Sequence, residues 1–390
     1  MSDAFSGKRT PGRGAKPLAE GGGGAPVSPS PRTVALTGGG TAGHVTPHLA
    51  LLPRLLERGW RVHYIGTAGG IERGLMEGRA GVRYHVISSG KLRRYFSLRN
   101  LTDPFRVAAG FFQAFRALGK VKPDVVFSKG GFVAVPVVAA AWLRGIPVLA
   151  HESDLTPGLA NRISAKFARK VAATFPECAA ALGKKGVYTG TPMRAALFSG
   201  SREKGLSLAG FAGDKPVLLM MGGSQGAQSV NGALRAALPA LLPEMDVLHL
   251  CGRGKLEPSL AGTPGYFQAE YLDEELPHVL AAADIVLSRA GATAIGEFLA
   301  LCKPMLLVPY PKGASRGDQI LNARNFAARG LARVLPQEEL TPETLASALR
   351  ALREGAETMR AAQRSEPGAE GTDAILALLS QLAGEKGETA

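Results

Sequence analysis

Two stretches of this chain repeat one local order, and that order constrains the fold more than any other feature. The apolar run Val34–Leu36 is followed by the glycine cluster Gly38–Gly43 and by a helical pattern that opens at Thr46. Further along, Val217–Met221 is followed by a second glycine cluster, Gly222–Gly226. A strand, a glycine loop and a helix start hold anions well, because free backbone N–H groups point at the ligand. The repetition predicts an α/β chain with two Rossmann-like halves that face each other across a cleft.

Short apolar runs alternate with longer helical patterns in both halves, which is typical of parallel sheets covered by helices. The strands expected in the first half are Val34–Leu36, Val62–Ile65, Tyr84–Ile87, Val125–Phe127, Val148–Ala150 and Val171–Ala173. Those expected in the second half are Val217–Met221, Val247–Leu250, Ile285–Leu287 and Met305–Val308. Apolar residues of the segment 105–118 recur at three- and four-residue spacing, which predicts an amphipathic helix.

The length of the chain favours two domains. A chain of 390 residues with 45% hydrophobic positions has enough apolar surface for two ordinary cores. We expect residues 1–32, which are rich in Gly, Pro and Ser, to form a disordered tail because they bury too little apolar surface. The first domain is expected at 33–194 and the second at 195–365.

Two features bear on the compartment. The longest apolar stretch, Phe132–Leu143, is shorter than the roughly 20 residues needed to cross a bilayer, so membrane contact is expected to be peripheral. The three cysteines are scattered and form neither a zinc motif nor a disulfide framework, which fits a reducing cytoplasm.

The chain is strongly basic. Its formal charge of +14 indicates a polyanionic partner or an acidic membrane surface, and charge alone does not choose between nucleic acid and lipid. The segment 83–122 holds nine Lys or Arg residues against one acid, Asp103. Its centre combines Arg93 and Arg94 with Tyr95 and Phe96, which predicts a mixed basic and apolar surface for anionic lipids. A solvated basic face over ordinary core residues is the alternative.

The first glycine cluster matches the dinucleotide pattern G-x-G-x-x-G between a strand and a helix, so an NAD-dependent oxidoreductase must be considered. That pattern expects an acidic residue about 20 positions further on to bind the ribose. The second expected strand ends at Ile65 and is followed by Gly66 and Thr67, without such an acid. The sequence therefore disfavours NAD, and a purely structural turn is the other alternative.

Three further sites carry side chains suited to chemistry. His44 follows the first cluster directly, and an imidazole there suits a general base that removes a proton from an alcohol. The second cluster offers backbone N–H groups and the Ser224 hydroxyl to a diphosphate. Glu297 lies near the start of an expected helix, where a carboxylate can accept hydrogen bonds from both hydroxyls of a ribose. The alternatives are a histidine bonded to a local carbonyl, a simple turn and a helix-start acid.

A polar group follows the strand Val148–Ala150. His151, Glu152 and Asp154 are expected on the cleft side, because the carboxyl ends of parallel strands meet at one edge of a sheet. No D-x-D motif occurs in the sequence, so no metal site is expected and diphosphate charge would be met by N–H groups, helix dipoles and an arginine.

Taken together, Gly38–His44, His151–Asp154, Thr189–Arg194, Gly222–Gly226 and Arg289–Glu297 closely resemble the motifs of the MurG family. These peripheral-membrane transferases add N-acetylglucosamine (GlcNAc) from UDP-GlcNAc to lipid I, the undecaprenyl-diphosphate-linked muramoyl-pentapeptide, and so make lipid II for peptidoglycan. The resemblance implies a GT-B fold, with the acceptor mainly on the first domain and the donor nucleotide mainly on the second. It implies that the last helix, expected at 372–385, returns to the first domain.

The same resemblance implies partners and a location. The expected partners are UDP-GlcNAc, lipid I, an anionic inner-leaflet surface at the cytoplasmic face of the cell membrane, and other cell-wall synthesis proteins. No cofactor and no nucleic acid are expected.

Position by position, the resemblance also implies the donor contacts. Those in the two loops and near the hinge are Thr41, Ala42, Gly43, Arg194 and Ser224. Leu272 would lie near the uracil, Glu297 on the ribose and Gln319 near the sugar. The five residues before Glu297 would also bind the donor; they are Ala292, Thr293, Ala294, Ile295 and Gly296.

Several of these positions depart from the family pattern. Ala42 stands where a glycine is common, and Ala294 and Gly296 lack hydroxyls. Asp154 stands where an asparagine binds the donor, and an acid beside a diphosphate is repelled unless it binds sugar hydroxyls or the acceptor instead.

The reaction implied is direct inverting transfer, with His44 as the first candidate for the base and Glu152 as the second. One rival is another GT-B enzyme that uses UDP-sugars, either a glycolipid synthase or a UDP-GlcNAc 2-epimerase. A rival of a different class is a non-catalytic subunit that binds nucleotide sugars. The basic apolar surface disfavours the epimerase, and the presence of His44 and Glu297 disfavours the idle subunit.

Overall fold

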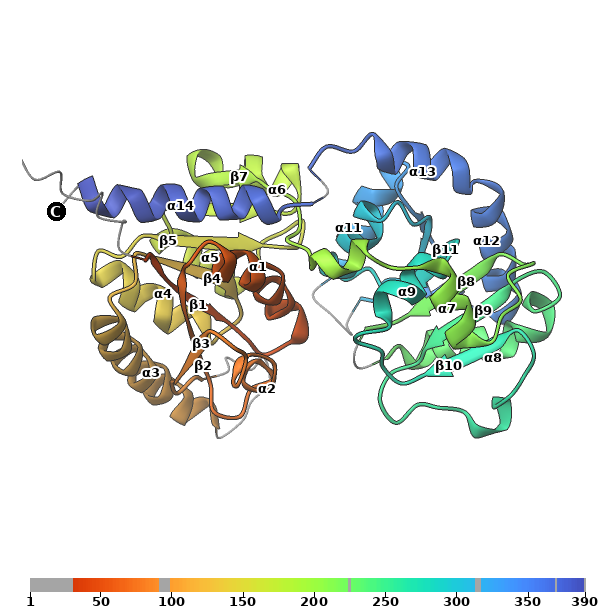
Figure 1. Cartoon of the computed structure of the whole chain (residues 1–390), viewed down its shortest axis with the longest axis horizontal. Coiled ribbons are helices and arrows are strands. Elements are labelled where there is room, and N and C mark those ends of the chain that lie inside the picture. The colour runs from red at the N-terminus through yellow and green to blue at the C-terminus, as the bar shows by residue number, and fades with distance from the viewer. Residues whose placement is uncertain (1–30, 91–98, 224–225, 313–316, 369, 389–390) are drawn as a thin grey trace, which may run out of the picture. The chain divides into compact units, whose positions relative to one another are not determined.

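The computed structural model describes residues 31–90, 99–223, 226–312, 317–368 and 370–388, and the compact unit that begins at Arg32 holds two β-sheets (Figure 1). The first has the strand order β3-β2-β1-β4-β5-β6-β7, and the second has the order β10-β9-β8-β11-β12-β13. All pairings between these strands are parallel. Each sheet starts near its middle and grows in both directions, which is the doubly wound order of a Rossmann-like fold. The predicted α/β class with two Rossmann-like halves is confirmed.

The strands are short and the helices connect them. The strands of the first sheet are β1 (Thr33–Gly38), β2 (Arg61–Gly66), β3 (Val82–Val86), β4 (Val125–Gly130), β5 (Val148–Glu152), β6 (Lys170–Ala173) and β7 (Gly186–Tyr188). Those of the second are β8 (Val217–Met221), β9 (Asp246–Leu250), β10 (Tyr266–Ala269), β11 (Ile285–Ser288), β12 (Met305–Leu307) and β13 (Arg333–Val334).

The helices that accompany the first sheet are α1 (Thr46–Glu57), α2 (Ile71–Met76), α3 (Arg99–Val121), α4 (Ala134–Leu143), α5 (Leu159–Phe167) and α6 (Pro176–Ala181). Those after it are α7 (Arg202–Ala209), α8 (Gln228–Leu241), α9 (Leu276–Ala282), α10 (Ala292–Ala300), α11 (Asp318–Ala328), α12 (Pro342–Glu354), α13 (Ala356–Arg364) and α14 (Thr372–Glu388).

Alternation along the central strands builds a core on each face of the first sheet. Val34 and Leu36 of β1 pack in one apolar cluster with α1, whereas Ala35 between them packs in another with α3 and α4. Successive side chains of a strand point to opposite faces, so a central strand covered on both sides reads as a continuous apolar run. The second sheet repeats this arrangement, with α8 and α12 on one face and α9, α10 and α11 on the other.

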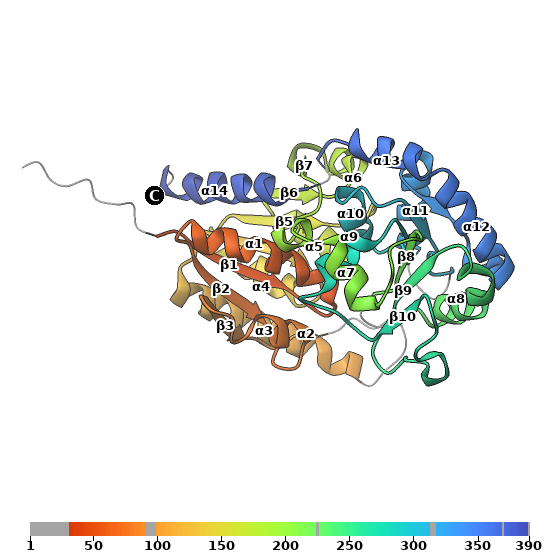
Figure 2. The same cartoon turned by 45° about the vertical axis from the view of Figure 1, so that its right-hand side comes forward.

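Helix α14 completes the core of the first sheet although it comes last in the sequence. Its residues Ile375, Leu376 and Leu379 are almost fully buried in the cluster that contains β1 and α1. Figures 1 and 2 both show this helix beside β5, and it contacts α1, β4 and β5. The chain therefore crosses back after α13, and Met193 and Thr372 are hydrogen bonded at the crossing.

All ten predicted strands are present, and three further strands were missed. These are β7, β10 and β13, and each of them lies at the edge of its sheet. An edge strand is paired on one side only and is partly exposed, so it does not need the apolar run by which a buried strand is recognised.

Helix α3 forms as predicted but uses its apolar residues on two faces. Ala114 and Leu118 are fully buried against the sheet, whereas Phe105 and Phe112 are 78% and 69% exposed. Among the residues that the structure describes, no helix combines the length and apolar character that a bilayer span requires. The predicted surface residues Arg93, Arg94, Tyr95 and Phe96 lie outside the described residues.

Candidate functional site

Each sheet has a point where the chain reverses its direction of growth, and the predicted loops lie there. In the first sheet β1 and β4 are neighbours, yet the chain leaves them toward opposite sides. The loops that follow diverge and open a crevice at the carboxyl edge, which is where open α/β sheets bind ligands. In the second sheet the loops after β8 and β11 have the same relation.

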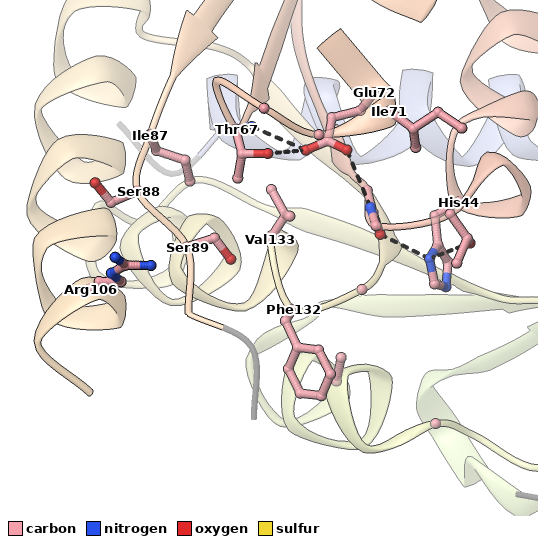
Figure 3. A pocket seen from close by; sticks show the side chains of 18 of the residues that line it. His44, Thr67, Ile71, Glu72, Ile87, Ser88, Ser89, Arg106, Phe132 and Val133 are labelled. Carbon is pink, nitrogen blue, oxygen red and sulfur yellow. Dashed lines mark hydrogen bonds between the residues drawn. The ribbon is translucent and has the colours of Figure 1, made fainter. Parts of the chain in front are cut away.

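Glu72 of α2 lies beside the first glycine cluster and holds it in shape (Figure 3). Its fully buried carboxylate accepts hydrogen bonds from the backbone N–H groups of Gly40 and Thr67, both at 3.2 Å, and from the Thr67 hydroxyl. A Cβ added to Gly39 would lie 2.6 Å from the carboxyl carbon of Glu72, and Gly40 has a φ of +88°. A side chain at the first position would clash and at the second would be strained, so the loop requires glycine.

His44 ends the 3-10 turn Ala42–His44, which overlaps the end of this cluster, and its ring faces a pocket (Figure 3). Nδ1 lies 3.0 Å from the carbonyl oxygen of Gly39 and 3.1 Å from the Thr41 hydroxyl. A carbonyl oxygen can only accept, so the first contact assigns the tautomer that carries its proton on Nδ1. In that tautomer the basic lone pair is on Nε2, so the ring is oriented to take up a proton there.

Glu152, at the end of β5, is buried and anchors the following loop. Its carboxylate accepts hydrogen bonds from the N–H groups of Asp154 at 2.9 Å and Gly158 at 3.1 Å, and from the Asn161 amide at 2.9 Å. Burial, and next the nearby charge of Asp154, raise the pKa of Glu152. These contacts give the carboxylate a structural task, and its role as a base remains a prediction.

Asp154 faces helix α11 of the second half. Its Oδ1 accepts a hydrogen bond from the side-chain amide of Asn322 at 3.0 Å, and the oxygen of the same amide accepts one from the Leu155 N–H at 3.0 Å. An acidic residue at 154 is thus matched by an amide that donates to it. The contact ties the loop after β5 to α11.

A buried lysine lies behind the same edge of the sheet. Lys129 of β4 is only 2% exposed, and its ammonium donates a hydrogen bond to the Ser153 hydroxyl. Burial lowers the pKa of Lys129 to about 8, although the carboxylates of Glu152 and Asp154 oppose that shift. Burial and the charge of Lys129 lower the pKa of His48 to about 3, so this histidine is neutral.

The pocket at the switch point of the first sheet has a volume of about 1230 Å³. Thr41, His44, Glu152 and Asp154 all line it, so the structure brings these predicted residues together. Exposed apolar side chains contribute to its walls: Ile71, Val86 and Leu159 are 41%, 50% and 49% exposed. Polar groups from the end of β3 and from α3 complete it, among them Ser88, Ser89 and Arg106 (Figure 3).

In the second half, Glu297 lies in the second turn of α10, and its side chain is buried. Only 8% of the residue is exposed, and burial raises the pKa of Glu297 to about 7, with Arg194 acting in the opposite direction. Arg194 is held by Asp273, whose carboxylate lies 3.1 Å from its guanidinium. A buried carboxylate that is partly ionised near neutral pH is prepared to accept hydrogen bonds from a ligand.

Other predicted donor contacts take up positions around α10. The Gln319 side-chain oxygen accepts a hydrogen bond from the Tyr310 N–H at 3.3 Å, and Leu272 is half-buried against the core of the second half. A Cβ added to Gly43 would lie 3.7 Å from the Thr293 hydroxyl, so the first glycine cluster and the start of α10 approach each other. Ala292 and Ile295 are buried with α10, Ala294 is half-buried, and Gly296 lies against Thr191. Ser224 lies outside the described residues, and only the backbone of Ala42 is described.

Three polar residues of this region, Glu72, Lys129 and Asn322, were not predicted from the sequence, and Arg289 was noted only as part of a motif, without a role. Two of them had a signal, because Lys129 interrupts an apolar strand and Glu72 follows a second glycine pair after β2. Arg289 is 5% exposed, donates to the carbonyls of Val308 and Pro309, and packs over the Tyr310 ring. It therefore braces the loop after β11.

Within the described part of the chain, no three His, Cys, Asp or Glu side chains come together in a way that could hold a metal ion.

Comparisons with known proteins cover almost the whole described chain. Residues 34–173 match the glycosyltransferase family 28 N-terminal domain, and residues 217–376 match its C-terminal domain. The UDP-N-acetylglucosamine--N-acetylmuramyl-(pentapeptide) pyrophosphoryl-undecaprenol N-acetylglucosamine transferase of Geobacillus thermodenitrificans is 52% identical over 353 residues, which are 90% of this chain and 99% of that protein.

Two solved structures illustrate how far the fold alone can discriminate. The crystal structure of Acinetobacter baumannii MurG is 27% identical, with a TM-score of 0.71 over 90% of this chain and 100% of that one. A putative UDP-N-acetylglucosamine 2-epimerase from Listeria monocytogenes has a TM-score of 0.63 over 93% of this chain and 98% of that one, at 12% identity. The second likeness shows the fold and nothing more.

Proposed function

The chain belongs to the MurG family of glycosyltransferase family 28, and on that premise we propose that it transfers GlcNAc from UDP-GlcNAc to lipid I. The product is lipid II, the disaccharide precursor of peptidoglycan. The observation that carries this proposal is the 52% identity to a transferase of that name over 99% of its length. The reaction needs a site for the acceptor and a site for the donor, and each half has a candidate site at the carboxyl edge of its sheet.

The pocket of the first half is the acceptor site. Its volume of about 1230 Å³ suits a large sugar-peptide headgroup, and its glycine-rich wall lets a ligand approach the backbone. Exposed apolar residues at its walls suit a substrate whose other end is a polyprenyl chain. Arg106 and the hydroxyls of Ser88 and Ser89 are available to the acceptor's charged and polar groups.

His44 is the general base. The acceptor hydroxyl gives its proton to Nε2 while its oxygen attacks the anomeric carbon of the donor sugar. The bond from that carbon to the UDP oxygen breaks on the opposite face, and its electron pair leaves with the diphosphate. The configuration at the anomeric carbon is therefore inverted. The Nδ1–H bond to the Gly39 carbonyl holds the ring in the tautomer that this step requires.

The second half binds the donor. The Glu297 carboxylate accepts hydrogen bonds from the ribose hydroxyls, and Gly222, Gly223 and Arg194 face the diphosphate. Charge that develops on the leaving UDP is stabilised there by N–H groups and the guanidinium. Leu272 lies near the uracil, and Gln319 and the start of α10 lie near the sugar.

A peripheral membrane location follows from the acceptor. Phe105 and Phe112 project from α3, and the same helix carries Arg106 and Arg116. Apolar side chains that enter the interface and cations that attract anionic headgroups are the two components of peripheral binding. We assign this face to the anionic inner leaflet, at the cytoplasmic side of the cell membrane.

The direct test is transfer by the purified chain from labelled UDP-GlcNAc to a short-chain lipid I analogue, with a chelator present. We expect a lipid-linked GlcNAc product that is unaffected by the chelator. A parallel reaction without acceptor measures conversion of UDP-GlcNAc to its 2-epimer, which we expect to be absent. Absence of the lipid-linked product would contradict the proposal, and epimer formation would favour the epimerase.

A further inference from the structure

A second cavity lies at the edge of the first sheet opposite the candidate site. It has a volume of about 710 Å³ and is formed where β2 and β3 begin, next to the last residues of α1 and α3. The candidate site lies beyond the carboxyl ends of the same sheet, so the strands separate the two. We name this second site the β2–β3 cavity.

The β2–β3 cavity is basic. Arg61, Arg83 and Lys120 line it and are exposed, and His63 and His85 line it beside them. None of its lining residues is acidic. Cations that line one concave wall repel one another, and an anion placed among them relieves that repulsion.

Ordinary structural reasons explain only part of this arrangement. Lys120 belongs to the last turn of α3, where a cation is stabilised by the helix dipole. Arg61 donates a hydrogen bond to the Thr33 hydroxyl at 3.0 Å. Neither reason applies to Arg83, which lies in the edge strand β3, or to the two histidines on neighbouring strands.

The two histidines form a hydrogen-bonded and stacked pair whose protonation is disfavoured by the cations around it. His63 Nδ1 lies 2.9 Å from His85 Nε2, and the rings are stacked with centroids 5.1 Å apart. One nitrogen of this contact donates and the other accepts, so at least one ring is neutral. Burial lowers the pKa of His63 to about 4, and the charges of His85, Arg83 and Arg61 add to that effect. Burial, Arg83 and Lys120 likewise lower the pKa of His85.

We propose that the β2–β3 cavity binds a phosphate-bearing anion, held by Arg83, Lys120 and Arg61 and by the histidine pair. A guanidinium and an ammonium from two different elements can contact one phosphate group from two sides. The apolar part of the wall, which includes Trp60 and Val82, limits how far water screens those contacts. The anion comes either from free phosphate compounds or from the headgroup of a phospholipid.

Binding of the anion is coupled to protonation of the histidine pair. The cations from β2, β3 and α3 that face the pair are the ones an anion would neutralise, so the pKa of each histidine rises on binding. The complex then takes up a proton, and by linkage the affinity for the anion increases as pH falls.

The test measures binding of inorganic diphosphate to the full chain by calorimetry, with saturating UDP to occupy any nucleotide site. R83Q/K120Q removes two cations of the cavity, and K166Q/K184Q removes two exposed lysines elsewhere on the same half. We expect R83Q/K120Q to weaken binding at least tenfold and the control to change it less than twofold. Equal affinities of the two variants for diphosphate would exclude a free phosphate compound as the anion.

The lipid arm uses flotation with vesicles that contain phosphatidylglycerol. If the anion is a headgroup, R83Q/K120Q floats at least fivefold less than K166Q/K184Q, whereas an effect on diphosphate alone identifies a free phosphate compound. If the two variants behave alike both in calorimetry and in flotation, the proposal is wrong.

The proton coupling has its own readout. Sulfate stays fully ionised between pH 6 and 8, so its affinity reports on the protein alone. The wild-type chain should bind sulfate more tightly at pH 6 than at pH 8. The ratio of the two affinities should be at least threefold larger for the wild-type chain than for H85Q. Equal ratios would contradict the role of the histidine pair. None of these measurements depends on transferase activity, so they stand or fall separately from the proposed function.

Discussion

His44 is the residue on which the proposed chemistry depends most. A general base contributes about 10²- to 10⁴-fold to a rate, so H44A should lower kcat by that amount and leave KM for UDP-GlcNAc nearly unchanged. Steady-state kinetics measure both, and circular dichroism checks that the variant is folded. A kcat within fivefold of the wild-type value would move the base to another group, of which Glu152 is the next candidate.

Glu297 should make donor binding depend on pH. The carboxylate is the better acceptor for ribose hydroxyls, and a pKa of about 7 means that it is protonated progressively as pH falls below neutral. We expect KM for UDP-GlcNAc to rise between pH 8 and pH 6, and E297Q to raise KM at pH 8 and to lose this pH dependence. An E297Q variant with the wild-type pH profile would contradict the assignment.

Stability provides the control for E297Q. A carboxyl group whose pKa is raised by folding stabilises the native state fully below its unfolded pKa, and this contribution is lost as pH rises through 7. At pH 8 the buried charge lowers the free energy of unfolding by about 3 kcal/mol relative to a carboxylate that is fully exposed to water. E297Q removes that cost, so urea unfolding should show it at least as stable as the wild-type chain, and a raised KM would not be due to misfolding.

Residues at strand ends were predictable because their position follows from the alternation of strands and helices. His44, Glu152 and Glu297 each follow a recognisable apolar run, and two of them line one pocket. Glu72 and Lys129 were missed for a physical reason: their roles depend on which backbone groups and hydroxyls fold against them. Glu72 accepts a hydrogen bond from the Gly40 N–H, and Lys129 donates one to the Ser153 hydroxyl. In both pairs the two residues are far apart in the sequence.

The first glycine cluster depends on α2 for its conformation. E72A would leave the N–H groups of Gly40 and Thr67 without this acceptor, and each such loss costs about 1–3 kcal/mol. We expect urea unfolding to show a destabilisation of about 2–6 kcal/mol. The matched control is E77A, because the exposed Glu77 pairs with Arg73 and surface pairs contribute about 0–1 kcal/mol. Similar losses in the two variants would refute the role of Glu72.

Helix α3 is the element that we propose to contact the membrane. F105S/F112S removes its two most exposed aromatic rings, each of which would bury apolar area at a membrane interface. Flotation with anionic vesicles should fall at least fivefold. The control F198S/L208S removes apolar side chains that are 51% and 39% exposed on η3, at Ala195–Phe198, and on α7. If the two double variants float equally, α3 is not the membrane face.

Every strand that is paired on both sides was predicted, and of the four edge strands only β3 was. The central strands of both sheets are apolar on two faces, and all of them were recognised from the sequence. The edge strands β7, β10 and β13 have one open side and were missed. The sequence pattern of α3 predicted a helix correctly, but periodicity could not say that Phe105 and Phe112 face away from the core.

For the molecule as a whole, we propose that the acceptor binds to the first half and the nucleotide to the second. The most direct measurement of that claim compares the two KM values of two variants. R106A alters the pocket of the first half, and E297Q alters α10 of the second. We predict that R106A raises KM for the lipid I analogue and leaves KM for UDP-GlcNAc within twofold, and that E297Q does the reverse. If each variant raises both KM values alike, or if R106A raises only KM for UDP-GlcNAc and E297Q only KM for the lipid I analogue, the assignment of the two substrates to the two halves is wrong.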